Sequence, residues 1–221
     1  MALGLSKKEN LRIGLLDVDI CGPSIPRMMG IESEEIKESP QGMIPIYKEK
    51  NLAIMSISYL IKDKKTAIIW RGPRKIGLIK EFLYNTNLDK LEYLIIDTPP
   101  GTSDEHLTLV QYLKLSNIKG AIIVTTPQEI SLLDVRKEIS FCEKTNVKVI
   151  GIVENMAGFI CPHCNKKTDI LEANTGGGDG LSKEINLNLI GRLPLEPQIL
   201  LSSVKGNYFL ILFLGQKLPK K

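Results

Sequence analysis

The stretch Leu91–Gly101, LEYLIIDTPPG, decides the fold that we predict for this chain. Its apolar residues do not alternate with polar ones, which is typical of a parallel strand that helices cover on both faces. Two prolines and a glycine then end the strand and prevent a helix from starting at once. Asp97 is thereby placed at the carboxyl end of a strand, where open α/β sheets bind their ligands. An acid at that position either holds hydrated Mg²⁺ beside nucleotide phosphates or caps the turn, and the residue pattern leaves both interpretations open.

Apolar segments and helical patterns alternate along the rest of the chain. This alternation predicts an α/β fold with a doubly wound, mostly parallel sheet and helices on both faces, in one domain over residues 1–221. Residues 1–5 are expected to be the tail of a helix, and residues 20–30 an irregular loop. We expect strands over residues 11–16, 43–47, 52–58, 67–70, 120–125, 147–153 and 189–193, and helices over residues 73–85, 103–115, 128–146, 176–186 and 195–203.

The composition excludes several classes of partner. Of the 221 residues, 43% are hydrophobic and 24% charged, as in an ordinary globular protein. The net charge is +4, but the lysines are scattered and only 5% of residues are aromatic, so we expect no nucleic-acid partner. No secretory signal opens the chain, and the longest apolar run, Tyr208–Leu214, is far shorter than the ~20 residues that span a bilayer. We therefore expect a cytoplasmic protein without a membrane partner.

Two acids, Asp17 and Asp19, follow the predicted strand over residues 11–16. Carboxylates at the end of a strand can reach a metal-bound phosphate or orient a water molecule. The glycine and proline that follow, Gly22 and Pro23, fix a loop that can change shape with the γ-phosphate of a nucleotide. Read alone, the motif slightly favours a turn with two solvated acids. Asp97 at the end of a second strand shifts the interpretation towards a site.

Cys161 and Cys164 form a C-x-x-C motif within residues 159–169. Two thiolates at this spacing can bind one soft metal centre from a single turn. A zinc or iron–sulfur site normally needs four ligands, and the sequence has no second C-x-x-C, so a second copy of the chain is one way to complete the set. A thioredoxin-like redox pair and a chance pair of small buried residues are the alternatives, and the lysines nearby disfavour burial.

Asn155 and a glycine run are weaker signals. Asn155 follows the predicted strand over residues 147–153, and its amide offers the donor and acceptor that an adenine edge needs. Taken alone, an asparagine that turns the chain before Gly158 is at least as good an interpretation. The run Gly176–Gly180 is able to cradle a phosphate, but such runs are common, and we favour a mobile loop before a helix.

Together these stretches resemble the Mrp/ApbC family of iron–sulfur cluster carrier ATPases, in the MinD and nitrogenase-iron-protein branch of the P-loop NTPases. The blocks follow the order of the family from about residue 11 to residue 200. They are LDVDICGPSIPRMMG (16–30), WRGP (70–73), IDTPPGTS (96–103), VTTPQEISLLDVR (124–136), VENMAGFICPHC (153–164) and GRLPLEPQI (191–199).

The resemblance implies a homodimer with ATP and Mg²⁺ at its interface, and a labile [4Fe–4S] cluster that bridges two C-x-x-C pairs and is passed to apo-proteins. Asp19 matches the switch acid that positions the attacking water, and Asp97 matches the Walker B acid near Mg²⁺. Asn155 matches an adenine-contacting position. Cys161 and Cys164 match the cluster ligands.

One family motif, the phosphate loop G-K-G-G-V-G-K-[ST], is absent from this sequence, which contains no Gly-Lys dipeptide. That loop would supply phosphate-binding amides, lysines and a Mg²⁺-binding hydroxyl, and the strand before it would join the sheet. We therefore expect an N-terminally truncated chain that binds ATP poorly as given. A degenerate, non-catalytic metal-binding module and a MinD-like membrane-positioning ATPase are the competing interpretations.

Overall fold

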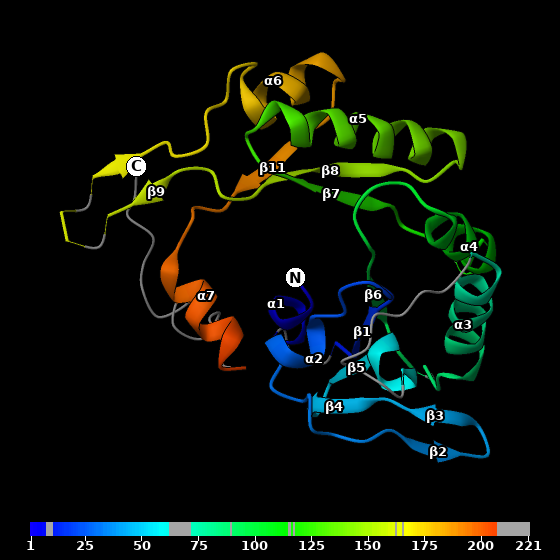
Figure 1. Ribbon diagram of the computed structural model, residues 1–221. Coiled ribbons are helices and arrows are strands. Elements are labelled where there is room, and N and C mark those ends of the chain that lie inside the picture. The colour runs from blue at the N-terminus through cyan, green and yellow to red at the C-terminus, as the bar shows by residue number, and fades with distance from the viewer. Residues whose placement is uncertain are drawn as a thin grey trace. The chain divides into compact units, whose positions relative to one another are not determined.

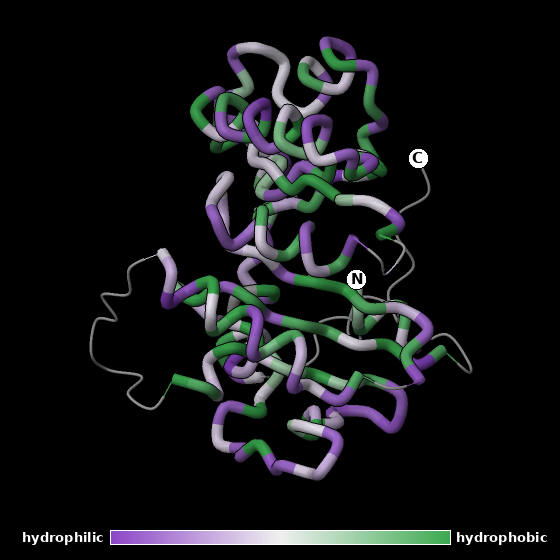
Figure 2. The backbone as a smooth tube through the Cα atoms, turned by 90° about the vertical axis from the view of Figure 1, so that its right-hand side faces the viewer, coloured by the Kyte–Doolittle hydropathy of each residue, from purple (hydrophilic) through white to green (hydrophobic). Residues whose placement is uncertain are grey.

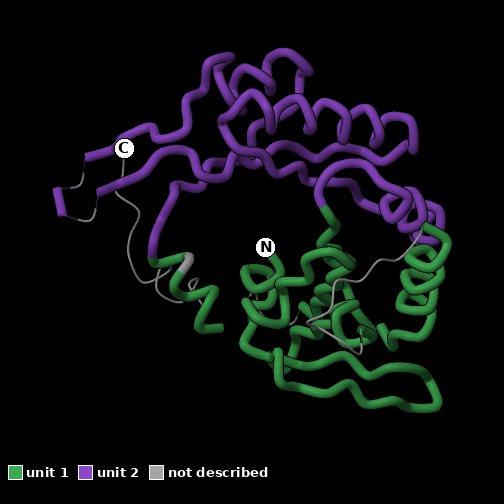
Figure 3. The backbone as a smooth tube through the Cα atoms, in the orientation of Figure 1, with its two compact units in different colours: residues 1–99, 198–221 green, residues 100–197 purple. Residues whose placement is uncertain are grey.

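The computed structural model describes residues 1–7, 11–61, 72–88, 90–114, 116, 118–161, 163, 164 and 166–206. The chain forms two compact units, unit 1 (residues 1–99 and 198–221) and unit 2 (residues 100–197) (Figure 3). Parallel strands and helices alternate in the chain, as the labels of Figure 1 show, so the predicted α/β fold class is confirmed.

The sheet of unit 1 contains four strands, of which three are parallel. Its central strands are buried along their whole length, as expected of parallel strands covered on both faces. The strand order is β4 (Ile46–Glu49), β5 (Leu52–Ser56), β1 (Ile13–Asp17) and β6 (Tyr93–Asp97), with β4 antiparallel to β5.

One prediction about β6 is wrong. The apolar run in LEYLIIDTPPG indicated a strand buried on both faces, but Tyr93 is 48% exposed and the middle of the strand is only half-buried. The physical reason is position, because β6 ends the strand order of the described sheet and pairs there with β1. An apolar run indicates that a strand can be buried, but the strands and helices next to it in the fold determine whether the strand is buried.

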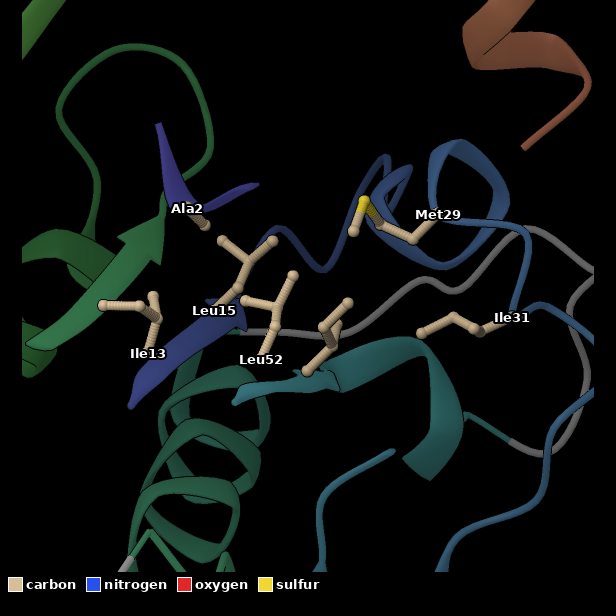
Figure 4. Packing of buried hydrophobic residues seen from close by; sticks show 7 residues of the cluster. Ala2, Ile13, Leu15, Met29, Ile31 and Leu52 are labelled. Carbon is tan, nitrogen blue, oxygen red and sulfur yellow. The ribbon is translucent and has the colours of Figure 1, made fainter. Parts of the chain in front are cut away.

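The core of unit 1 joins the two buried strands to the segments that cover them (Figure 4). The helix α1 (Ala2–Ser6) packs Ala2 against this cluster, which confirms the helix expected at residues 1–5. Each fully buried aliphatic side chain contributes roughly 1.5–3 kcal/mol, so these contacts hold β1 and its carboxyl end firmly. The cluster consists of Ala2, Ile13, Leu15, Met29, Ile31, Leu52 and Ile54.

The loop after β1 contains a short helix, α2 (Ile25–Met28), where the sequence predicted irregular structure throughout. Pro26 lies in its first turn, where the amide hydrogen that proline lacks has no partner within the helix. The prolines therefore allow one helical turn here, and the prediction is wrong for these residues.

The remaining elements of unit 1 agree only in part with the predictions, because β2 (Lys37–Ser39) lies where no strand was predicted and a 3-10 helix replaces the end of the strand predicted over residues 52–58. The helix predicted over residues 73–85 is confirmed, whereas the strand predicted over residues 43–47 is divided in two at Pro45. The strand predicted over residues 67–70 and the apolar run 208–214 lie outside the described residues. These elements are α3 (Gly72–Asn85), the hairpin β2 (Lys37–Ser39) and β3 (Gly42–Ile44), the 3-10 helix η1 (Ile57–Leu60) and α7 (Pro197–Val204), which begins at the last residue of unit 2.

Unit 2 is built on a parallel sheet, with two helices packed against the same apolar cluster of the sheet. Leu132, Val135 and Ile139 pack with Leu181 against Ile123 and Ile152 of the strands. Figure 2 shows mostly hydrophobic colour along strands, while hydrophilic and hydrophobic residues alternate along helices. The strand order is β11 (Leu189–Arg192), β8 (Val149–Glu154) and β7 (Ala121–Thr125), and the helices are α5 (Glu129–Lys144) and α6 (Gly177–Glu184).

Two further features of unit 2 lie at the ends of its strands. The helix α4 (Asp104–Leu113) begins with a capping box between Ser103 and His106, which confirms the predicted start. A small antiparallel hairpin of β9 (Phe159–Ile160) and β10 (Lys167–Thr168) carries the C-x-x-C motif. None of the helices formed by the described residues is long and apolar enough to cross a membrane.

Candidate functional site

Three carboxylates gather at the carboxyl ends of β1 and β6, and the innermost is Asp17. Its side chain is fully buried at the end of β1, where the strand register sets it beside Ser56 and Asp97. The Ser56 hydroxyl donates to Asp17 Oδ2 at 2.9 Å, and the Asp19 amide donates to Asp17 Oδ1 at 3.2 Å. Ser58 Oγ lies 2.9 Å from Ser56 Oγ and extends this buried network. Through these hydrogen bonds, the Asp17 side chain connects the end of β1 with β5 and with the loop that follows β1.

Burial raises the pKa of Asp17 to about 6, because the charged carboxylate loses its hydration. Hydrogen bonds from Ser56 and from the amides of Asp19 and Ile25 lower that pKa, and the charge of Asp97 raises it. The sequence motif presented Asp17 only as one of two acids. Its burial follows from the position of β1 inside the sheet, which the motif alone does not reveal.

Asp19 closes the loop that follows β1. Its Oδ1 accepts hydrogen bonds from the amides of Cys21 at 2.9 Å and Gly22 at 3.0 Å. Lys75 Nζ lies 3.8 Å from the sulfur of Cys21, so α3 also touches this loop. The alternative of a turn with two solvated acids is right about the turn but wrong about Asp17, which is buried, and the hydrogen bonds to Asp19 Oδ1 fix the direction of that carboxylate.

Asp97 ends β6, and its backbone oxygen accepts the Val18 amide at 3.0 Å. The Asp97 side chain is exposed, yet the protein atoms around it still desolvate the carboxyl and raise its pKa, and the charge of Asp19 adds to this. Among the described residues, no group of three or more acidic, histidine or cysteine side chains is placed to hold a metal ion by itself. Mg²⁺ at these acids would therefore need water and phosphate oxygens as further ligands.

Asn155 follows β8 in unit 2, as predicted. The backbone amide of Asn155 donates to the Thr125 backbone oxygen at 2.7 Å, which links the ends of β8 and β7. Its Oδ1 accepts the amide of Met156 at 2.9 Å, and Met156 has a positive φ of 56°. The side chain thus caps the turn after the strand, and the adenine contact stays a prediction. Asp19 and Asp97 belong to unit 1, whereas Asn155 and the two cysteines of the motif belong to unit 2.

The C-x-x-C motif forms the tip of the β9–β10 hairpin. Cys161 is half-buried, Cys164 is exposed, and neither forms a disulfide. The backbone amides of Cys164 and His163, and then the Cys164 thiol, donate towards Cys161 and lower the pKa of its thiol. The Cys161 amide donates to the Lys166 oxygen at 3.1 Å and closes the hairpin. The two thiols lie at an accessible turn, and the lowered pKa of the Cys161 thiol favours its thiolate form. This donor set fits a soft metal centre.

The helix predicted over residues 176–186 is confirmed as α6, and the glycine run forms its N-cap and first turn, so the mobile loop that we favoured for residues 176–180 is wrong. Gly176 caps this helix with a φ of 87°, and the Gly178 amide donates to Oε2 of the buried Glu154. A Cβ atom at Gly178 would lie 2.9 Å from that oxygen, so a larger residue there would displace the Glu154 carboxylate. An internal carboxylate thus occupies the helix N-terminus where a phosphate was the alternative. Sequence reasoning missed Glu154, whose signal was an acid at the end of an apolar strand.

The fold matches that of MinD-type and ParA-type P-loop NTPases. MinD from Aquifex aeolicus is 15% identical, with a TM-score of 0.60 over 100% of this chain and 90% of that chain. MinD from Pyrococcus furiosus is 18% identical, with a TM-score of 0.57 over 93% of this chain and 78% of that chain. At these identities the likeness shows the fold alone.

A model of the family described as ParA, NUBPL iron-transfer P-loop NTPase, matches residues 1–217, and the chain belongs to this family. The predicted resemblance to Mrp-type iron-transfer P-loop NTPases is thereby confirmed. A nucleotide-binding protein from Archaeoglobus fulgidus, solved with ADP and with cobalt, is 34% identical to this chain. Its TM-score is 0.76 over 93% of this chain and 77% of that chain.

Proposed function

We propose that this chain carries an iron–sulfur cluster on Cys161 and Cys164 and delivers it to apo-proteins. The observation that supports this most directly is the accessible thiol pair, in which the amides of one turn lower the pKa of Cys161. Membership of an iron-transfer family supports the same cargo. Because one chain offers two thiolates and a [4Fe–4S] cluster takes four, two copies of the chain would share one cluster.

The nucleotide part of the proposal concerns Asp19, Asp97 and Asn155. Asp97 would face Mg²⁺ through water, and Asp19, whose direction the loop amides fix, would orient the water that attacks ATP. Asn155 would contact the adenine edge. The Archaeoglobus relative was solved with ADP, which supports a nucleotide in this family. Since the sequence holds no G-K-G-G-V-G-K loop, we expect this chain alone to bind ATP poorly.

The proposal is tested by anaerobic reconstitution of the full chain with ferrous iron and sulfide. We expect the broad visible absorbance of an iron–sulfur cluster and about four iron atoms for every two chains. The loaded chain is then mixed with an apo-enzyme whose activity needs a [4Fe–4S] cluster, with and without ATP, and enzyme activity is measured. Activity should appear at a rate above that of free iron and sulfide. A chain that loads the cluster but never releases it would instead be a metal-binding module.

A further inference from the structure

We propose that Glu154 is a positioning residue, which closes the base of the segment that carries the two cysteines and thereby sets the geometry of their turn. This inference rests on the proposed metal-carrying function and extends it to a residue that lies outside the hairpin. The segment, residues 159–176, leaves the sheet of unit 2 after β8 and returns to it at α6.

The Glu154 carboxylate joins β8, β11 and α6 at the carboxyl ends of the strands. It is 5% exposed at the end of β8, and Arg192 Nε of β11 donates to its Oε1 at 3.0 Å. Its Oε2 accepts the Gly178 amide of α6, and the guanidinium of Arg192 also pairs with Asp179. A buried carboxylate with charge-assisted hydrogen bonds on both oxygens is held more firmly than an exposed ion pair.

The outgoing end of the cysteine segment is fixed by a ladder that starts at Glu154. The Leu193 amide donates to the backbone oxygen of Glu154 at 2.8 Å, and the Ala157 amide donates to the backbone oxygen of Leu193 at 2.8 Å. The Leu195 amide then donates to the Gly158 oxygen at 2.7 Å, and Phe159 pairs with Leu195 in a parallel bridge. Backbone hydrogen bonds therefore continue from the end of the sheet to a point two residues before Cys161.

The returning end of the segment is held by the side chain of the same residue, Glu154. The Thr175 hydroxyl is hydrogen-bonded to Glu129 at the start of α5, and Glu129 in turn binds Arg136 at 3.0 Å. Three residues further on, the Gly178 amide reaches Glu154. Both ends of the segment are thus fixed at one residue, the outgoing end through the Glu154 backbone oxygen and the returning end through the Glu154 carboxylate, and the position of these ends constrains the turn at the tip.

Replacing Glu154 by glutamine separates this role from simple packing. The amide oxygen of glutamine still accepts the Gly178 amide, but the negative charge that holds Arg192 is lost. The base of the segment should loosen while the side-chain volume stays the same. Removal of residues that orient metal ligands typically lowers metal affinity about 10-fold to 100-fold, and we expect a change in this range.

The experiment titrates the full, reduced chain with Co²⁺ alone and follows the thiolate-to-cobalt absorbance. For Glu154→Gln we expect an affinity at least ~10-fold weaker and a shifted thiolate band. Glu92→Gln is the matched control, because Glu92 also accepts a backbone amide, that of Arg12 at 2.6 Å, and pairs with the Arg12 guanidinium at 3.9 Å, but lies exposed in unit 1. The control should bind Co²⁺ as the wild type does. Equal affinity in Glu154→Gln and wild type would overturn the proposal.

Amide hydrogen exchange distinguishes positioning from general stability. In Glu154→Gln the Leu193 and Leu195 amides, which follow the released Arg192 along the chain, should exchange faster, while the Ile152 amide, bonded to the Asn188 oxygen at 2.8 Å within the sheet, should not. Equal acceleration at Ile152 would mean a merely structural role and would contradict the proposal. If Glu154→Gln does not fold, Arg192→Gln serves in its place, since it leaves the Glu154 acceptor for Gly178 intact.

A measurement without metal separates this inference from the proposed function. In the reduced, metal-free chain, amide exchange is followed at Cys161, whose backbone amide donates to the Lys166 oxygen at 3.1 Å and closes the hairpin. We expect this amide to exchange faster in Glu154→Gln than in the wild type. A wild type that never shows thiolate-to-cobalt absorbance would count against the metal-carrying function, and the exchange results would still decide the role of Glu154.

Discussion

Cys161→Ser is expected to abolish cluster loading, with iron per chain after reconstitution falling by more than about 100-fold, beyond what changes around a ligand usually cause. The reason is chemical, because a serine hydroxyl does not ionise near neutral pH and its oxygen is a hard ligand for a soft centre. Each chain supplies two thiols, so a cluster shared by two copies would lose two of its four ligands at once. The measurements are bound iron and sulfide, and the visible absorbance of the reconstituted chain.

The neighbouring His163 offers the matched control for this prediction. His163 is exposed in the same turn, and its backbone amide, which helps to lower the pKa of the Cys161 thiol, is kept in His163→Gln. This variant should load the same amount of iron as the wild type. If His163→Gln lost the cluster and Cys161→Ser kept it, the imidazole would be the ligand and the assignment of the thiols would be wrong.

Asp17→Asn is expected to raise the free energy of unfolding at pH 7 by about 3 kcal/mol, at ~1.4 kcal/mol for each pKa unit. The pKa of Asp17 is raised from 3.8 to about 6 in the folded chain, so the folded state binds the proton more tightly than the unfolded state does. The stability that this proton contributes is complete below pH 3.8 and is lost as pH rises through about 6. The wild type should therefore be less stable at pH 7 than at pH 5, and the variant should lack this part of the pH dependence.

Urea unfolding at several pH values tests the prediction for Asp17. The advantage of Asp17→Asn should be present at pH 7 and shrink towards zero near pH 4, since asparagine resembles the protonated acid. Asp134→Asn on α5 is the control, because Asp134 is exposed and paired with Lys137 at 3.0 Å, an arrangement worth little. A variant that is less stable than the wild type at pH 7 would show that the hydrogen bonds of Asp17 outweigh its lost hydration.

The acids and the cysteines of the candidate site could be predicted from the sequence because their positions depend on local rules. An apolar strand followed by a turn places Asp17 and Asp97 each at the carboxyl end of a parallel strand, and the observed register pairs them. The spacing of Cys161 and Cys164 brings two sulfurs to one turn whatever the surrounding fold. The positions of the acids and of the cysteine pair can be predicted from only a few neighbouring residues in the sequence.

The features that were missed depend on partners distant in the sequence. The exposure of β6 follows from its place at the end of the strand order, and the apolar run itself contains no such information. The carboxylate at the start of α6 belongs to Glu154, 24 residues before Gly178, and the glycine run itself does not indicate this partner. Contacts of this kind arise from the tertiary fold, and local propensity does not determine them.

The carboxylate at the start of α6 also has a consequence for the conditions under which the protein works. A helix N-terminus whose backbone amides have no partner in the protein binds anions from solution, and its occupancy changes with the concentration of phosphate or sulfate. Glu154 is part of the same chain, so its local concentration does not fall when the solution is diluted. The base of the cysteine segment should keep its geometry whether the surroundings are rich or poor in free phosphate.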